Sequence, residues 1–211
     1  MSDFVNTVDS IGDEALAGSI IDRSITEILD NYATSIGISA FDNCSALTTV
    51  DFPAVTRIAN YAFRRCSALA TVDFPVVTRI DMDAFYYCSA LTAVDFPAVT
   101  NIDTSAFHSC SKLTTVDFSA AVRIGSGAFF GCSALRTLIL RSATKATLGG
   151  ADVFDGGTPI KSGTGYIYVP AALVDGYKAA NRWSTFAAQF RSLEDYTVDG
   201  TTTGALDASK I

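Results

Sequence analysis

The chain has 211 residues, of which 49% are hydrophobic, and a formal net charge of −7. This apolar fraction is enough for one substantial core, whereas the acidic balance disfavours nucleic acid because it repels phosphate backbones. No apolar run approaches the ~18 residues that a membrane-spanning helix needs, and MSDFVNTVDSIGDEAL at the start lacks the pattern of a secretory signal.

Residues 1–23 are predicted to form a helical cap. Ile11, Ala15 and Leu16 have the spacing of a short amphipathic helix across about residues 9–21. Such a helix would cover the open end of a core that continues along the chain.

Residues 24–170 are dominated by a 22-residue period. The unit reads I-x-x-x-A-F-x-x-C-S-x-L-T-x-V-D-F-P-x-V-T-R. A fixed period without insertions predicts a solenoid, in which neighbouring units share one core. The alternation in L-T-x-V-D-F predicts short strands with one face inward, stacked in parallel about 4.8 Å apart.

Both ends of the array depart from the unit. Residues 25–36 are interpreted as a degenerate first coil, with Ile28 in register with Val50 and Asp30 where Phe52 stands. After a glycine-rich loop, residues 166–170 imitate V-D-F-P and predict a longer last coil.

Residues 171–196 are predicted to form a helical C-terminal cap, followed by a loose or extended tail at 197–211. A helix is expected over about 171–181, and Trp183, Phe186 and Phe190 are expected to close the core. The predicted fold class is therefore an α/β repeat solenoid of short parallel strands with a helical cap at each end.

The repeated A-F-x-x-C-S-x-L-T-x-V-x-F-P resembles the BspA-like leucine-rich repeat, whose pattern is I-G-x-x-A-F-x-x-C-x-x-L-x-x-I-x-I-P. The resemblance covers about residues 24–170. It implies a bacterial surface or secreted protein that binds host proteins or other cells. The flanks VNTVDSIGDEAL and YTVDGTTTGALDASKI resemble, more weakly, the ends of short gut-bacterial repeat proteins, some of them phage-associated.

The cysteines recur once per unit. They are Cys44, Cys66, Cys88, Cys110 and Cys132. Disulfides or a metal site are the alternatives to a structural role, but the count is odd and no C-x-x-C pair occurs. A disulfide also needs Cβ atoms about 3.8 Å apart and converging, whereas stacked coils hold them parallel. Structural buried thiols are therefore expected.

An acidic ladder is predicted on the solvent face of the strands. It consists of Asp51, Asp73, Asp95 and Asp117. Like charges about 4.8 Å apart repel by about 0.9 kcal/mol even at the dielectric constant of water. The ladder is either a simply solvated face or is compensated by Arg57, Arg79 and Arg123, by a cation such as calcium, by a basic partner, or by raised pKa values.

A second candidate surface lies where the repeat allows variation, after each A-F pair. We call it the variable stripe; it consists of Tyr61, Arg64, Arg65, Tyr86, Tyr87, His108 and Phe130. Exposed aromatics with arginine are typical of interface hot spots. The alternative is a chance mixture of side chains on a surface ridge.

No catalytic or metal-binding pattern stands out. His108 is the only histidine, and no nucleophile elbow, phosphate-binding loop, zinc motif or dinucleotide fingerprint occurs. No cofactor or metal is expected. The sequence therefore predicts a non-enzymatic module that binds a protein or glycan, as a monomer or weak homo-oligomer; the alternative is a rigid spacer in a phage particle, and an enzyme is disfavoured.

Overall fold

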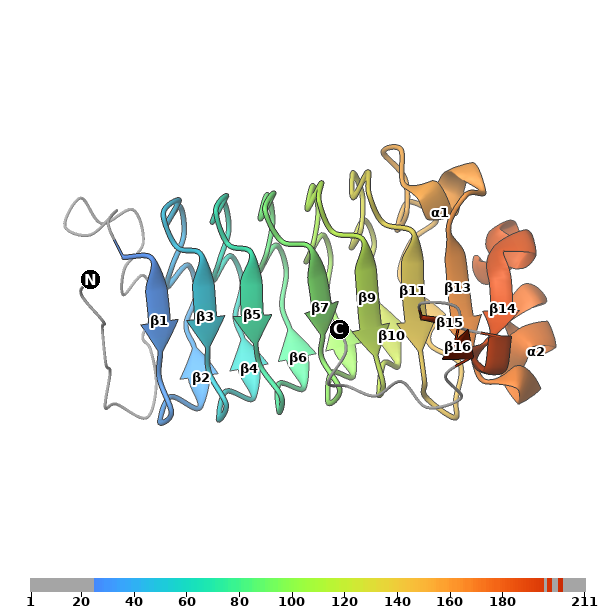
Figure 1. Ribbon diagram of the computed structural model, residues 1–211, viewed down its shortest axis with the longest axis horizontal. Helices are drawn as coiled ribbons and strands as arrows, with labels where there is room; N and C mark the ends of the chain where they lie inside the picture. The colour runs from blue at the N-terminus through green and yellow to red at the C-terminus, as the bar shows by residue number, and fades with distance from the viewer. Residues whose placement is uncertain (1–24, 196, 199–200, 203–211) are drawn as a thin grey trace.

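The computed structural model describes residues 25–195, 197–198 and 201–202. The expected N-terminal cap at 1–23, with its helix across 9–21, lies outside the described residues. Residues 25–195 form an elongated stack of coils in which two parallel sheets face each other (Figure 1).

Each of the first six coils contributes one strand to a front sheet and one to a back sheet, and two further strands extend the front sheet alone. The front strands are β1 (Glu27–Leu29), β3 (Thr49–Asp51), β5 (Thr71–Asp73), β7 (Ala93–Asp95), β9 (Thr115–Phe118), β11 (Thr137–Leu140), β13 (Tyr166–Val169) and β14 (Phe190–Ser192). The back strands are β2 (Ser35–Ile36), β4 (Arg57–Ile58), β6 (Arg79–Ile80), β8 (Asn101–Ile102), β10 (Arg123–Ile124) and β12 (Thr147–Leu148).

The strand register confirms the 22-residue coil. Val50 pairs with Val72, and Ile58 pairs with Ile80, so equivalent residues of successive coils lie side by side. Ile28 pairs with Val50, which confirms the degenerate first coil. In that coil Asp30 is buried and its carboxylate accepts the backbone N–H groups of Tyr32 and Ala33, closing a turn where later coils place phenylalanine.

Stacked phenylalanines fill the space between the sheets. The rings of Phe63 and Phe85 lie 5.3 Å apart, and those of Phe85 and Phe107 5.2 Å apart, both stacked. A second column includes Phe74 and Phe96, and all these rings are fully buried. Burial of a phenylalanine stabilises a fold by about 1.5–3 kcal/mol, so the two columns carry much of the core.

The cysteines tie neighbouring coils together. All five are free. The thiol of Cys66 donates to the carbonyl of Phe41, and the thiol of Cys88 to that of Phe63, each at 3.1 Å. Cys110 and Cys132 repeat the bond to the preceding coil. Cys44, in the first full coil, is only half-buried, so the expected structural thiols are found with one partial exception.

Aromatic side chains pack against the C-terminal end of the core. The expected helix over 171–181 is shorter: a 3-10 turn (Ala171–Leu173) leads into α2 (Val174–Lys178). Trp183 is buried, and its ring lies 6.2 Å from that of Phe154, the last member of the phenylalanine column. Phe190 then begins β14, which pairs in parallel with β13, so the front sheet continues beyond residue 170.

Smaller elements complete the described residues. α1 (Pro159–Ser162) is capped by Thr158 in the last-coil loop, and further 3-10 turns occupy Trp183–Gln189 and Leu193–Asp195. Within the tail, β15 (Thr197–Val198) and β16 (Thr201–Thr202) pair antiparallel. None of the helices in these residues combines the length and apolar character that a bilayer crossing requires.

The front sheet is interrupted once. Its strands form two groups, β1-β3-β5 and β7-β9-β11-β13-β14, with no ladder between β5 and β7. The back sheet runs without a break from β2 to β12. The coils are therefore continuous on one side and parted on the other.

Candidate functional site

The variable stripe lies on the turns that lead from each back strand to the next front strand, along the upper edge in Figure 1. The structure brings three of its rings into one stack. Tyr86 lies 4.8 Å from His108, and His108 lies 4.9 Å from Phe130, between ring centroids. Tyr87 packs beside Tyr86 at 4.9 Å. Tyr87 and Phe130 are exposed, so the stack presents an aromatic surface to solvent.

The cationic end of the stripe is held by ion pairing. Arg64 donates from Nε to Asp42 Oδ1 at 2.9 Å, and its guanidinium lies 4.8 Å from the centre of the Tyr61 ring. The pairing with Asp42 raises the pKa of Arg64. Arg65, next in the chain, is exposed. Arg64 therefore positions Tyr61, while Arg65 is available to a ligand.

The turn backbone makes the stripe unusual. Each full coil holds two residues in the left-handed region, and in the fifth full coil both are glycine, Gly127 and Gly131. In the earlier full coils the same two positions carry non-glycine residues with φ between 54° and 62°, namely Ser39, Asn43, Tyr61, Arg65, Asp83, Tyr87, Ser105 and Ser109. Bulky side chains at such angles cost of order 1–2 kcal/mol each relative to the relaxed backbone.

The left-handed geometry has a structural cause. It directs the backbone N–H of Arg65 to the carbonyl of Tyr86 at 2.7 Å, and that of Tyr87 to the carbonyl of His108 at 2.9 Å. These bonds join successive coils, so the fold requires the backbone angle. The fold does not require a tyrosine or an arginine there, because Gly131 adopts the same angle.

A shallow hollow of about 470 Å³ lies beside the aromatic stack. Its lining residues are Asn43, Ser45, Arg65, Ser67, Tyr86, Tyr87 and Ser89. The combination of ring faces, hydroxyls and one guanidinium offers both apolar contact and hydrogen bonds, which is the composition of a site for a polar ligand with apolar patches.

His108 takes part in the stripe as a ring. Its Nδ1 lies 2.9 Å from the Oγ of Ser109, and burial lowers its pKa, although the nearby Asp83 partly opposes that shift. Burial therefore favours the neutral form of this imidazole, which stacks between two aromatic rings. In the part of the chain that the structure describes, no group of three or more His, Cys, Asp or Glu residues converges as a metal site would.

The acidic ladder is only partly formed. Asp51 pairs in register with Asp73, and Asp95 with Asp117, but Asp73 and Asp95 flank the break in the sheet. Burial raises the pKa of Asp51 and of Asp95, and a neighbouring carboxylate raises each further. Asp117 is buried rather than solvated, because Arg141 covers it with an ion pair of 2.7 Å.

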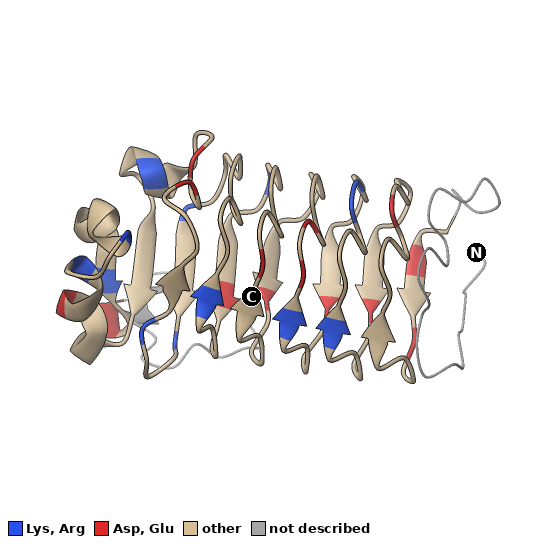
Figure 2. Cartoon of the chain, turned by 180° about the vertical axis from the view of Figure 1, so that it is seen from behind, with Lys and Arg blue, Asp and Glu red and all other residues tan. Residues whose placement is uncertain are grey.

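The arginines expected to compensate the ladder lie on the other sheet. Arg57 and Arg79 are on β4 and β6, where Figure 2 shows a row of basic residues, and Arg123 continues the row on β10. Arg57 Nη2 bonds Asp81 at 2.6 Å, and Arg79 bonds both Asp81 and, at 3.4 Å, Asp103. Of the alternatives for the front ladder, neutralisation by Arg57 and Arg79 is wrong, because both side chains pair with aspartates that follow the back strands.

Sequence reasoning missed Asp81 and Arg141. Asp81 is almost fully buried and anchors two arginines. A signal was present, because Asp81 follows Arg79 by two residues and Asp103 repeats the spacing after Asn101. Arg141 lies 24 residues after Asp117, two beyond the repeat step, so the 22-residue register alone does not pair them.

The comparisons with known proteins match the region of the 22-residue repeat. The family model described as "BspA type Leucine rich repeat region" matches residues 2–98 and 34–161. A leucine-rich-repeat protein of T. pallidum is similar in fold, with 23% identity, a TM-score of 0.56 and coverage of 68% of each chain. No curated protein matches the chain.

Two other solved structures are longer than this chain. A leucine-rich-repeat protein from Bacteroides ovatus has 25% identity and a TM-score of 0.54, covering 75% of this chain and 44% of its own. A leucine-rich cell-surface protein from Faecalibacterium prausnitzii has 27% identity and a TM-score of 0.47, covering 63% of this chain and 43% of its own. The chain thus spans less than half the length of either protein.

Proposed function

Because the chain belongs to the BspA-type leucine-rich-repeat family, we propose that it is a non-enzymatic binding module that holds a protein or glycan on its variable stripe. A leucine-rich-repeat scaffold presents side chains from successive turns at fixed spacing, which suits recognition of an extended ligand. The location implied by the family resemblance is the bacterial cell surface or the extracellular space, and it forms part of the same proposal.

The observation that carries the proposal is the backbone of the turns. Tyr61, Arg65 and Tyr87 stand at left-handed angles where glycine is the relaxed choice, and Gly131 in a later coil shows that glycine fits. Residues kept at an energetic cost to the fold are expected at functional sites. Within the stripe this cost falls on Tyr61, Arg65 and Tyr87, and Tyr87 adjoins the stack of Tyr86, His108 and Phe130.

The chemistry of the stripe supports a polar ligand with flat apolar faces. Exposed tyrosine rings offer large contact area with little loss of side-chain entropy, and their hydroxyls donate and accept hydrogen bonds. Arg65 and the serines of the hollow add directional donors. A sugar chain or a loop of a protein would meet the same surface.

The proposal is tested by screening the labelled protein against arrays of glycans and of extracellular-matrix proteins. The double variant Tyr86→Ser, Tyr87→Ser is expected to lose binding by at least about tenfold, the range of hot-spot aromatics, with little change in Tm. Tyr32→Ser is the matched control, because Tyr32 is exposed but lies on a different turn. Unchanged binding by the double variant would contradict the proposal.

The alternative, a rigid spacer in a phage particle, depends on a resemblance of the two flanks, most of which lie outside the described residues. The same experiment separates it from binding. A spacer would show no ligand binding that depends on Tyr86 and Tyr87, whereas a binding module would lose its binding when both are replaced.

A further inference from the structure

The break in the front sheet is a local loss of hydrogen bonds that every neighbouring pair of coils retains. The N–H of Phe52 donates to Asp73 and that of Phe96 to Asp117, but the equivalent bond from Phe74 to Asp95 is missing. Likewise, Thr114 donates to Thr92, whereas Thr92 makes no such bond to Ala70. The N–H groups of Phe74 and Thr92 and the carbonyls of Asp95 and Ala70 are therefore left facing the break.

The opening is closed at both of its ends. On the turns before β5 and β7, the Ser89 hydroxyl donates to the carbonyl of Ser67 at 3.3 Å. Beyond the two strands, the N–H of Thr100 donates to the carbonyl of Thr78 at 2.9 Å. Behind it, β6 and β8 remain paired. The result is a slot about five residues long, roughly 16 Å at 3.3 Å per residue, which opens only toward solvent on the front sheet.

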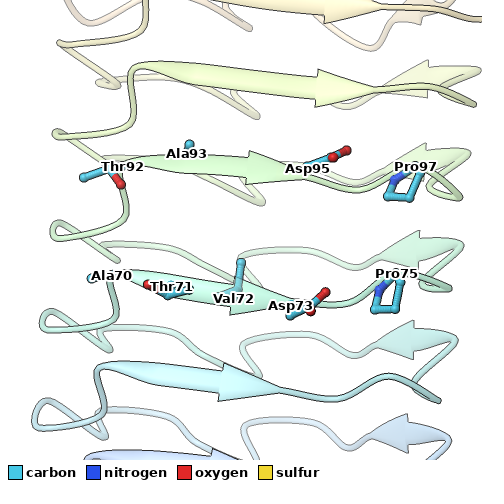
Figure 3. A pocket seen from close by; sticks show the side chains of 9 residues that line it. All are labelled: Ala70, Thr71, Val72, Asp73, Pro75, Thr92, Ala93, Asp95 and Pro97. Atoms are coloured by element: carbon cyan, nitrogen blue, oxygen red, sulfur yellow. The ribbon is translucent and has the colours of Figure 1, made fainter. Parts of the chain in front are cut away.

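The slot is a hollow of about 450 Å³ between two strands (Figure 3). Its lining residues are Ala70, Thr71, Val72, Asp73, Pro75, Thr92, Ala93, Asp95 and Pro97. Val72 is partly exposed here, whereas Val50 and Val94 at the equivalent positions are buried. Unpaired backbone groups and an uncovered valine are both unfavourable, so a ligand that covers them would be stabilised.

The negative charge of the slot favours a cationic ligand. Asp73 and Asp95 extend from adjacent strands at the same end of the slot (Figure 3). No lysine or arginine is among the lining residues. Two carboxylates and the unpaired backbone carbonyl of Asp95 lie at this end as acceptors, which attract a cation with several donors and repel an anion.

We infer that the slot between β5 and β7 binds the guanidinium group of an arginine presented by a partner protein. A guanidinium is planar and carries five N–H donors in a fixed fork, so it pairs with a carboxylate on one edge and a carbonyl on the other. An ammonium has the charge but not the flat shape. The slot lies on the front sheet and shares no residue with the variable stripe, so each site is testable without the other.

The test is a titration of ¹⁵N-labelled protein with acetyl-Gly-Arg-Gly-amide, followed by NMR. The amide signals of Thr92 and Phe74 are expected to shift, and those of Phe52 and Thr114 to stay. The lysine peptide acetyl-Gly-Lys-Gly-amide is expected to bind at least about tenfold more weakly. Equal binding of the two peptides, or no shift with either, overturns the inference.

Two matched variants locate the site. Asp95→Asn is expected to weaken binding of the arginine peptide by about tenfold or more, while Asp103→Asn, which removes the same charge from the back-sheet surface, leaves it unchanged. Amide hydrogen exchange checks the slot itself: Thr92 and Phe74 are expected to exchange faster than Thr114 and Phe96. Full affinity in Asp95→Asn, or equal protection of the four amides, overturns the inference.

Discussion

The interior and the turns of this molecule repeat with the same period but obey different constraints. Inside, the column of Phe63, Phe85 and Phe107 carries the same ring from Phe41 to Phe154, at spacings of 5.0–5.8 Å. On the turns, equivalent positions carry serine, asparagine, aspartate, arginine, tyrosine or glycine on one backbone geometry. The interior is thus specified by packing, and the turns are free to vary at a modest cost in stability.

The largest expected effect comes from breaking the interior. Phe85→Ala removes a buried ring from the middle of a column, and its neighbours on both sides lose their stacking partner. The free energy of unfolding is expected to fall by about 3–5 kcal/mol, measured by urea denaturation. Val76→Ala, at an exposed position of a neighbouring coil, is the control. A loss below about 1 kcal/mol for Phe85→Ala would show that the column does not carry the core.

The reactivity of the five cysteines distinguishes the buried interior from the less buried first full coil. Burial raises the pKa of Cys44 to about 11, and it raises the pKa of Cys66, Cys88 and Cys110 further. Iodoacetamide at pH 8 is therefore expected to modify Cys44 first, at a rate that rises about tenfold per pH unit below pH 11, since the thiolate is the nucleophile. Mass spectrometry of the native protein should show a single adduct. Comparable labelling of Cys88 without unfolding would contradict the buried ladder.

A moderate effect of opposite sign is expected on the turns. Tyr87→Gly relieves a left-handed tyrosine and is expected to stabilise the fold by up to about 1 kcal/mol, while ligand binding is lost. Gly131→Ala makes the reverse change at the equivalent position of a later coil and is expected to destabilise by about as much. Both are measured by thermal and urea unfolding. Destabilisation by Tyr87→Gly would mean that the side chain is held for packing and not for recognition.

The smallest effect concerns the acidic ladder. The pKa values of Asp51 and Asp95 lie above the ordinary value of 3.8 in the folded protein, chiefly through burial. The folded state therefore holds these protons more tightly than the unfolded state, so this contribution to the free energy of unfolding falls as pH rises from about 3.8 through the raised values. Asp95→Asn should flatten that dependence by less than about 1 kcal/mol. If the free energy of unfolding of Asp95→Asn depended on pH as that of the unmodified protein does, the raised pKa of Asp95 would be contradicted.

The features that the sequence predicts best are those that repeat in register. The coil length, the inward phenylalanines and the pairing of Ile28 with Val50 all follow from one period, because a one-dimensional stack has a single register. The stripe follows for the same reason: positions 22 residues apart, such as Tyr86 and His108, necessarily become neighbours.

The features that the sequence does not predict depend on departures from the period. Arg141 covers Asp117 from two residues out of register, and Asp81 takes the arginines assigned to the front ladder. The left-handed angle of Tyr87 is also hidden, since a tyrosine does not signal it. The residue types that favour this angle stand at the equivalent positions of other coils or at the paired position of the same coil: Asn43, Asp83, Gly127 and Gly131. The break between β5 and β7 occurs between coils of nearly the same sequence, where the pattern predicts an unbroken ladder.

That break also has a mechanical meaning. A stack whose members touch only their neighbours fails at its weakest junction, and the β5–β7 junction keeps the back strands and the ring columns but lacks the front ladder. Heat or tension is therefore expected to part the molecule there into two blocks of coils, and single-molecule pulling should record two rupture events instead of one. A ligand bound in the slot between β5 and β7 would connect the two blocks, so that a single rupture event is recorded.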